Sequence, residues 1–289
     1  MAEVYLATET HPDGRERVVV VKRVLENLAD AEDFLALFED EGRLAMKLVH
    51  PNIVRVLAVG QGGGLPFIAM EHLEGCDLRQ MLAHAGRAGM RLQPGLACAI
   101  AARVARGLQY AHTLRNEGGE ELGVVHRDVS PHNVFATLDG EVKLLDFGVA
   151  KSALQLTATR TGLIKGKLSY MAPEQLGGLQ VDARADLFSL GVVLWEMLTG
   201  ASLWKRDSET ATARAVRDES AFPPSMKAPG ISPEIDALVS AMLAKFPVSR
   251  PRSAADAAER LERLASSFGL SDPREEIARA VSRVLAASR

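Results

Sequence analysis

The chain contains the run Val125-His126-Arg127-Asp128-Val129-Ser130-Pro131-His132-Asn133, and a second run follows it as Leu145-Asp146-Phe147-Gly148. Together the two runs present two carboxylates and one carboxamide at fixed spacing. A carboxylate such as that of Asp128 can orient an attacking hydroxyl group and accept its proton, whereas Asn133 and Asp146 can hold metal ions. Each run is several residues long and the two occur in this order, so a chance match is improbable. The sequence therefore predicts a site that activates a hydroxyl group beside bound metal.

The two runs resemble the catalytic and metal-binding loops of protein kinases, in the serine/threonine style found in bacteria. The resemblance covers nearly the whole chain, from Ala2 to about Leu264. It implies that the cofactors are ATP and Mg²⁺ and that the γ-phosphoryl group passes to serine or threonine hydroxyls of protein substrates, with autophosphorylation. It also implies that Asp128 is the base or orienting group, and that Asn133 and Asp146 are the metal ligands.

Composition argues against a nucleic-acid-binding protein, a membrane-spanning protein and a disulfide-rich protein. The chain has 289 residues, 47% of them hydrophobic, which is enough for one large domain or two lobes. A formal net charge of −3 gives no reason to expect nucleic acid as a partner. No apolar run approaches the ~20 residues of a membrane span, and the N-terminus does not read as a signal peptide. Cys76 and Cys98 are too few for a disulfide framework, so we expect buried thiols in a cytoplasmic protein.

The apolar pattern predicts a β-rich first part and a helical second part. Residues 4–8 and 17–24 form the expected hairpin, residues 31–49 a helix, and residues 53–60 and 65–70 two more strands. Helical spacing then recurs in residues 77–86, 94–115, 182–200, 208–218, 232–245 and 253–266. This pattern predicts an α+β chain in two lobes, and with the resemblance it implies a protein-kinase-like fold: a small N-lobe at 1–73, a larger helical C-lobe at 74–268, and a C-terminal helical extension at 269–289. The extension could dock on the helical lobe or serve a partner, and we expect docking.

The resemblance extends to the residues that would hold the phosphates of ATP. Lys22, at the end of a valine run, matches the strand lysine that grips the α- and β-phosphates. Its ion-pair partner is expected on the next helix at Glu41, with Glu39 as the alternative, although Glu39 projects about 200° away around the helix. Val4 falls at the valine of the family's glycine-rich loop.

The segment Phe67–Gly75 resembles the last strand of the small lobe running into the hinge. The resemblance implies that adenine bonds to backbone groups at Glu71 and Leu73, with Met70 behind the pocket. Asp77 falls where the family often places an acid near the ribose. The same residue could serve as the N-cap of the helix that begins there, and the two roles are compatible.

The segment Gly166–Glu174 resembles the end of a kinase activation segment. The resemblance pairs Glu174 with Arg250 as a buried ion pair, and assigns Asp186 to brace the His-Arg-Asp turn through its backbone. Arg127 beside the catalytic Asp indicates an activation loop organised by phosphate. The candidate acceptors, each of which could instead be merely polar, are Thr157, Thr159, Thr161 and Ser169.

The sequence departs from the family pattern in three places: the glycine-rich loop, Ser130 and Lys167. Only the tail of the glycine-rich loop is present, at Ala2 and Val4, so we expect the family's first strand to be missing, and favour an upstream start over a truncated kinase. The lysine usual two residues after the catalytic Asp is Ser130, and the threonine usual near the end of the activation segment is Lys167. We hypothesise that Lys167 supplies the catalytic cation that position 130 lacks; the alternative is a solvent-facing loop charge.

Two other functions remain open at this stage. A pseudokinase or nucleotide-binding signalling scaffold would keep the fold without turnover, and the missing glycines and the serine at position 130 favour it. The presence of Lys22, Asp128, Asn133 and Asp146 argues against it, because a scaffold has no physical need for all four. A small-molecule kinase is disfavoured by the full activation segment, which exists to receive a polypeptide.

Overall fold

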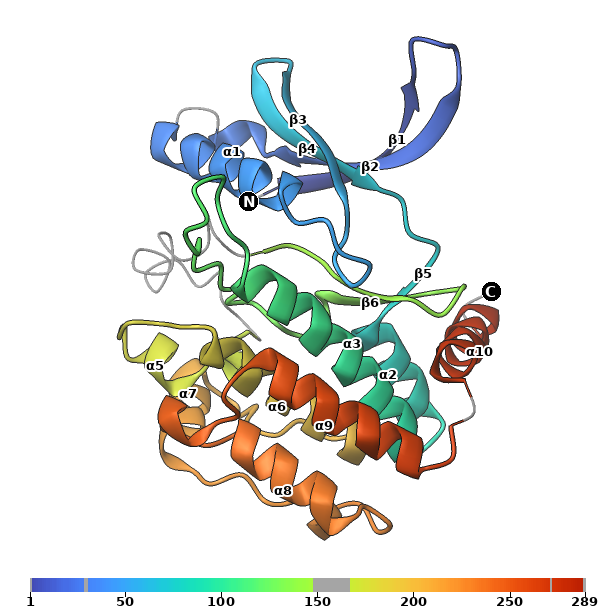
Figure 1. The fold of residues 1–289 in the computed structure, drawn as a ribbon, viewed down its shortest axis with the longest axis vertical. Helices are drawn as coiled ribbons and strands as arrows, with labels where there is room; N and C mark the ends of the chain where they lie inside the picture. The colour runs from blue at the N-terminus through green and yellow to red at the C-terminus, as the bar shows by residue number, and fades with distance from the viewer. Residues whose placement is uncertain (1, 29–30, 148–166, 271, 288–289) are drawn as a thin grey trace.

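A four-stranded antiparallel sheet forms one lobe of the computed structural model, which describes residues 2–28, 31–147, 167–270 and 272–287 (Figure 1). Its strands are β1 (Ala2–Thr10), β2 (Glu16–Val24), β3 (Val56–Gly62) and β4 (Leu65–Glu71), in the order β1-β2-β4-β3. A short 3₁₀ helix, η1 (Glu26–Leu28), follows β2. The predicted hairpin and the two later strands are confirmed.

The expectation of a missing first strand is not supported. The structure begins with β1, which is paired with β2 over its whole length, from Ala2 opposite Val24 to Thr10 opposite Glu16. The expectation rested on glycine spacing, whereas strand formation here depends on pairing with the valine-rich β2. β1 lies at the edge of the sheet, and Val4 and Leu6 are exposed on it.

Helix α1 (Glu32–Met46) packs on β3 and β4 (Figure 1). Its apolar side chains Phe34 and Phe38 form a small core with Val24 and Ile68. Gly42 allows the close approach, because a Cβ atom there would lie 2.8 Å from Cγ2 of Val59. The helix is therefore held at a fixed distance from the sheet that carries Lys22.

The second lobe is helical and is built around α6, which is buried along most of its length. The predicted helices are confirmed, with ends that differ by a few residues. The helices are α2 (Leu78–Arg87), α3 (Pro94–His112), α5 (Pro173–Leu176), α6 (Arg184–Thr199), α7 (Glu209–Asp218), α8 (Pro233–Met242) and α9 (Ala254–Ser267). Short 3₁₀ helices lie at η2 (Leu168–Tyr170), η3 (Pro224–Met226) and η4 (Pro247–Ser249).

A small second sheet lies between the lobes and was not predicted. Its strands are β5 (Gly75–Asp77), β6 (Val134–Thr137) and β7 (Val142–Leu144), in the order β5-β6-β7. Strands of three or four residues are too short for an alternating pattern to be recognised. β6 begins directly after Asn133 and β7 ends just before Asp146, so the open end of this hairpin carries both motifs.

Helix α10 (Pro273–Ala286) packs against β5, β6, α2 and α3 (Figure 1). Its inward side chains Ile277, Val281 and Val284 are buried in the main core, and Arg274 forms an ion pair with Asp139 at 3.0 Å. The expected docking of this segment on the helical lobe is confirmed. Within the described ranges, no helix combines the length and apolar character that crossing a membrane requires.

Candidate active site

The turn that carries the first motif is held by a buried carboxylate from α6. Asp186 accepts hydrogen bonds from the backbone N–H groups of His126 and Arg127, each at 2.8 Å, and contacts His112 Nε2 at 2.8 Å. Burial alone would raise the pKa of Asp186, but the contacts with His112 and His126 lower it below its ordinary value. These bonds also hold Arg127 in the left-handed region, at φ +64°, which costs free energy in a non-glycine residue. The His126 ring packs on Phe147, with centroids 4.6 Å apart.

Asp128 lies between an amide and an ammonium group. Lys167 Nζ is 2.7 Å from Asp128 Oδ2, and Asn133 Nδ2 donates to the same oxygen at 2.9 Å and to the Asp128 carbonyl at 2.8 Å. The Asp128 side chain is 8% exposed and that of Lys167 is 40% exposed. The meeting of positions 167 and 128 that the hypothesis requires is therefore present.

Lys22 joins the two lobes. Its Nζ lies 2.9 Å from Asp146 Oδ1 and 3.4 Å from Glu41 Oε1, and its side chain is 13% exposed. Glu39 points elsewhere and bonds to Arg43 at 2.8 Å. The structure thus places Glu41, and not Glu39, beside Lys22, and the lysine links α1 to the second motif.

Asn133 and Asp146 fit a magnesium site. The backbone N–H of Leu145 donates to the Asn133 carbonyl at 2.9 Å, which ties the two motifs together. The Asn133 amide nitrogen is engaged by Asp128, so its amide oxygen is directed elsewhere, and the Asp146 side chain is 34% exposed. The described residues form no cluster of three His, Cys, Asp or Glu side chains suited to a metal. One carboxylate with one amide suits Mg²⁺, which keeps water and phosphate oxygens as its other ligands.

One face of the sheet carries the expected nucleotide residues. Val4 stands directly opposite Lys22, and Lys22 opposite Ile68, so these side chains share a face with Met70. Val4 is 67% exposed on this face. Lys22, Met70 and Asp146 also line a small cavity of about 20 Å³.

The hinge residues are fixed by side-chain contacts. Oε1 of Glu71 accepts from the Arg55 backbone N–H and from Lys143 Nζ, each at 2.8 Å, and the Glu71 backbone N–H donates to the Arg55 carbonyl at 3.0 Å. Leu73 is half-buried. Asp77 is the N-cap of α2, where it takes part in a capping box. The capping role is thus observed, and the ribose role stays a prediction.

The end of the activation segment is anchored as expected. Arg250 Nη1 and Nη2 donate to the two carboxylate oxygens of Glu174 at 2.6 and 2.8 Å, and both side chains are buried. Ser169 is only 4% exposed, so a kinase could not reach its hydroxyl without local rearrangement. The other candidate acceptors, Thr157, Thr159 and Thr161, lie outside the described residues.

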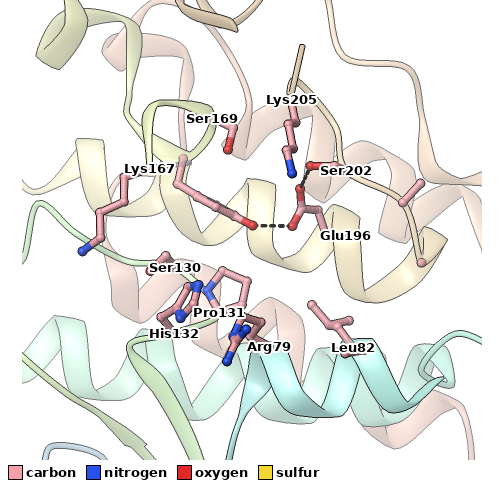
Figure 2. Close-up of a pocket in the computed structure, with 14 residues that line it drawn as sticks. Arg79, Leu82, Ser130, Pro131, His132, Lys167, Ser169, Glu196, Ser202 and Lys205 are labelled. Carbon is pink, nitrogen blue, oxygen red and sulfur yellow. Dashed lines mark hydrogen bonds between the residues drawn. The ribbon is translucent and has the colours of Figure 1, made fainter. Parts of the chain in front are cut away.

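Beside Asp128 lies a larger cavity that the sequence analysis missed (Figure 2). Its volume is about 720 Å³, and its lining includes Arg79, His132, Glu196 and Lys205. These residues come from α2, the loop after Asp128, α6 and the segment after α6. No motif links them in sequence, so only the fold brings them together.

Lys22 on a strand pairs with Glu41 on a helix, and Asp128 lies in a loop whose turn is held by Asp186 of the buried helix α6. This arrangement is typical of a two-lobed phosphotransferase. The family described as protein kinase domain matches residues 1–261. The chain belongs to the protein kinase family.

Individual relatives agree with this assignment. The chain is 43% identical over 262 residues to the tyrosine-protein kinase MasK of Myxococcus xanthus, and 38% identical over 260 residues to a probable serine/threonine-protein kinase of Streptomyces coelicolor. These matches cover 91% and 88% of the chain, which spans about two fifths of the length of these relatives (41% and 36%). Among solved structures, the PknI kinase domain of Mycobacterium tuberculosis aligns with a TM-score of 0.69 at 29% identity, covering 92% of this chain and 91% of that one.

Proposed function

We propose that this chain transfers the γ-phosphoryl group of ATP to hydroxyl groups of protein substrates and of itself, with Mg²⁺ as cofactor. One observation carries the proposal: two cation–carboxylate contacts, Lys22 with Asp146 and Lys167 with Asp128, are joined through Asn133 at the junction of the lobes. Phosphoryl transfer needs little covalent chemistry from the protein and depends on positioning and on charge stabilisation, which such an arrangement supplies.

In this proposal each side chain has a separate role. Asp128 orients the acceptor hydroxyl and takes its proton, while Lys167 offsets negative charge at the same place. Lys22 holds the α- and β-phosphates and is itself held by Glu41. Asn133 and Asp146 would hold Mg²⁺, which, when bound, neutralises the phosphate oxygens.

We propose serine and threonine as the acceptors and the cytoplasm, where ATP is available, as the compartment. Several relatives carry serine/threonine-kinase names, whereas MasK carries a tyrosine-kinase name. Phosphoamino-acid analysis of the modified protein tests the acceptor class directly. Phosphotyrosine alone would overturn the serine/threonine assignment without touching the proposal of phosphoryl transfer.

Intact-mass analysis after incubation with Mg-ATP tests the transfer itself. We expect added phosphate masses on the wild type and none on Asp128→Asn. The matched control is Asp207→Asn, an exposed carboxylate outside the site, which should behave as wild type. A wild type that binds ATP but gains no mass, and phosphorylates no added protein, would instead identify a nucleotide-binding scaffold.

A further inference from the structure

The 720 Å³ cavity, hereafter the Arg79–Lys205 cavity, opens directly beside the proposed catalytic carboxylate. Its lining includes the residues that follow Asp128, from Ser130 to His132, and also Lys167, whose Nζ contacts Asp128 (Figure 2). The backbone N–H of Arg79 donates to the Pro131 carbonyl at 3.1 Å, which fixes the first turn of α2 against this loop. A polypeptide whose hydroxyl reaches Asp128 must therefore place neighbouring residues in or beside this cavity.

The exposed charged groups of the cavity are cationic. Arg79 lies on the α2 side and Lys205 on the opposite side, and both side chains are exposed (Figure 2). In the part of the chain that the structure describes, neither forms an ion pair within 4.0 Å, although the charge of Lys205 acts on the nearby Glu196 carboxyl and lowers its pKa against the larger effect of burial, which raises it. His132 lies near Arg79, and burial, together with the positive charges of Arg79 and Lys167, lowers its pKa and outweighs the opposing effect of the Asp77 and Asp128 carboxylates. An anion entering the cavity would relieve this repulsion.

The one carboxylate in the lining is already engaged. Glu196 is buried, and its oxygens accept from Tyr170 Oη at 2.7 Å, from Ser202 Oγ at 2.8 Å and from the Leu203 N–H at 3.2 Å. Figure 2 shows the bond between Ser202 and Glu196 as a dashed line. With three of its acceptor positions filled and the charge of Lys205 nearby, Glu196 offers little to a cationic substrate side chain, whereas an anionic one meets exposed Arg79 and Lys205 directly.

We propose that the Arg79–Lys205 cavity selects polypeptide substrates carrying an acidic or already phosphorylated side chain near the acceptor hydroxyl. Arg79 presents a planar guanidinium suited to carboxylate and phosphate, Lys205 adds a second charge, and His132 becomes a further donor once protonated. This inference rests on the proposed function, because it specifies which polypeptides that activity modifies.

The test is a peptide library with a fixed Ser or Thr acceptor, in which one flanking position at a time is Asp, phosphoserine, Gln or Lys. At the position that enters the cavity we expect kcat/KM to exceed that of the Gln peptide by about fivefold for Asp and about tenfold or more for phosphoserine. The preference should shrink as salt is raised, since partly exposed charges are screened.

Charge reversal distinguishes recognition from misfolding. The Arg79→Glu/Lys205→Glu variant should lose the acidic preference and favour Lys peptides instead. The matched control, Arg87→Glu/Lys227→Glu, reverses exposed charges outside the cavity and should keep the wild-type preference.

Failure of this inference is distinguishable from failure of the proposed function. Transfer to peptides without charge preference, or with preference for Lys, would overturn the inference and leave the phosphoryl transfer intact. If no peptide is phosphorylated, the intact-mass assay decides whether the proposed function fails, and binding of the same fluorescein-labelled peptides without nucleotide decides the inference. Tighter binding of the acidic peptides, lost on charge reversal, supports it; equal binding overturns it.

Discussion

Two departures from the family pattern, Ser130 and Lys167, were recognised in the sequence, and the structure shows where the lysine lies. The sequence hypothesis required the side chain at position 167 to reach Asp128, and the two are 2.7 Å apart. The contact was predictable because both positions lie in recognisable motifs. Glu196 and Arg79 were not, because their meeting depends on the packing of α2 and α6 and on no local pattern.

Replacement of Lys167 by Ala should lower kcat by ~10²-fold or more with little change in KM for ATP, because the lost contact acts in the transition state. Steady-state kinetics with a protein substrate measure this. The control is Lys227→Ala, which removes an exposed lysine far from Asp128 in sequence and outside the cavity. Ser130→Lys should restore part of the rate in the Lys167→Ala background. An unchanged rate for Lys167→Ala would mean that the lysine has no catalytic role.

The buried carboxyl group of Glu196 should make the free energy of unfolding depend on pH. Burial raises its pKa above the ordinary 4.5, outweighing the hydrogen bonds from Tyr170 and Ser202. A carboxyl whose folded pKa is raised favours folding when protonated, so its contribution is present below pH 4.5 and is lost as pH rises through the folded pKa. Glu196→Gln avoids this loss.

The stability of Glu196→Gln relative to wild type should therefore increase from about pH 4.5 upward and then level off. Urea denaturation at a series of pH values measures the difference. Glu117→Gln, an exposed loop substitution, should show no such trend. A difference that is constant with pH for Glu196→Gln would contradict the assignment.

At the scale of elements, the long helices and the first hairpin could be predicted because each has apolar residues at its own period. The helix ends differ from the prediction by a few residues: α2 begins at Leu78 because Asp77 is its N-cap, and α8 ends at Met242 rather than at 245. The short strands β5, β6 and β7 could not be predicted, since their pairing is decided by residues far away along the chain.

The fit of α1 on the sheet gives a matched pair of glycine variants. Gly42→Ala places a methyl group 2.8 Å from Val59 Cγ2 and 3.0 Å from Ile68 Cγ1, and both neighbours are stiff, branched side chains. We expect a loss of about 1–3 kcal/mol in the free energy of unfolding. The accompanying shift of α1 should also lower kcat/KM for ATP, because α1 carries the Glu41 partner of Lys22.

Gly86→Ala in α2 is the control, since a Cβ there meets nothing within 4 Å. It should stabilise the protein by up to about 1 kcal/mol through helix propensity alone. Thermal denaturation and kinetics of both variants make the comparison. Equal effects of the two substitutions on stability would show that the close approach at Gly42 is unimportant.

At the scale of the whole molecule, ion pairs join segments that are distant in sequence, and burial decides their worth. The Arg250 side chain is 0% exposed and that of its partner Glu174 is 6% exposed. Removing either partner alone, as in Arg250→Met or Glu174→Met, should cost about 3–5 kcal/mol, because the other charge is left buried. The double variant should cost far less than the sum.

The exposed pair of Arg106 and Glu262, at 2.7 and 2.8 Å, is the control for this cycle. Breaking it should cost less than about 1 kcal/mol despite the two-point geometry, because solvent screens it. Double-mutant cycles by urea denaturation measure both pairs. Similar coupling energies at the two sites would refute burial as the deciding factor.

The bracing of the catalytic turn by Asp186 has a consequence for genetics. The same carboxylate completes the core of the helical lobe and holds Arg127 in a conformation that it would otherwise leave. Weakening it should melt the lobe and disorganise the turn together rather than slow the reaction in an intact fold. Asp186→Asn should therefore behave as a heat-sensitive allele, with kinase activity present in the cold and abolished over a narrow rise in temperature.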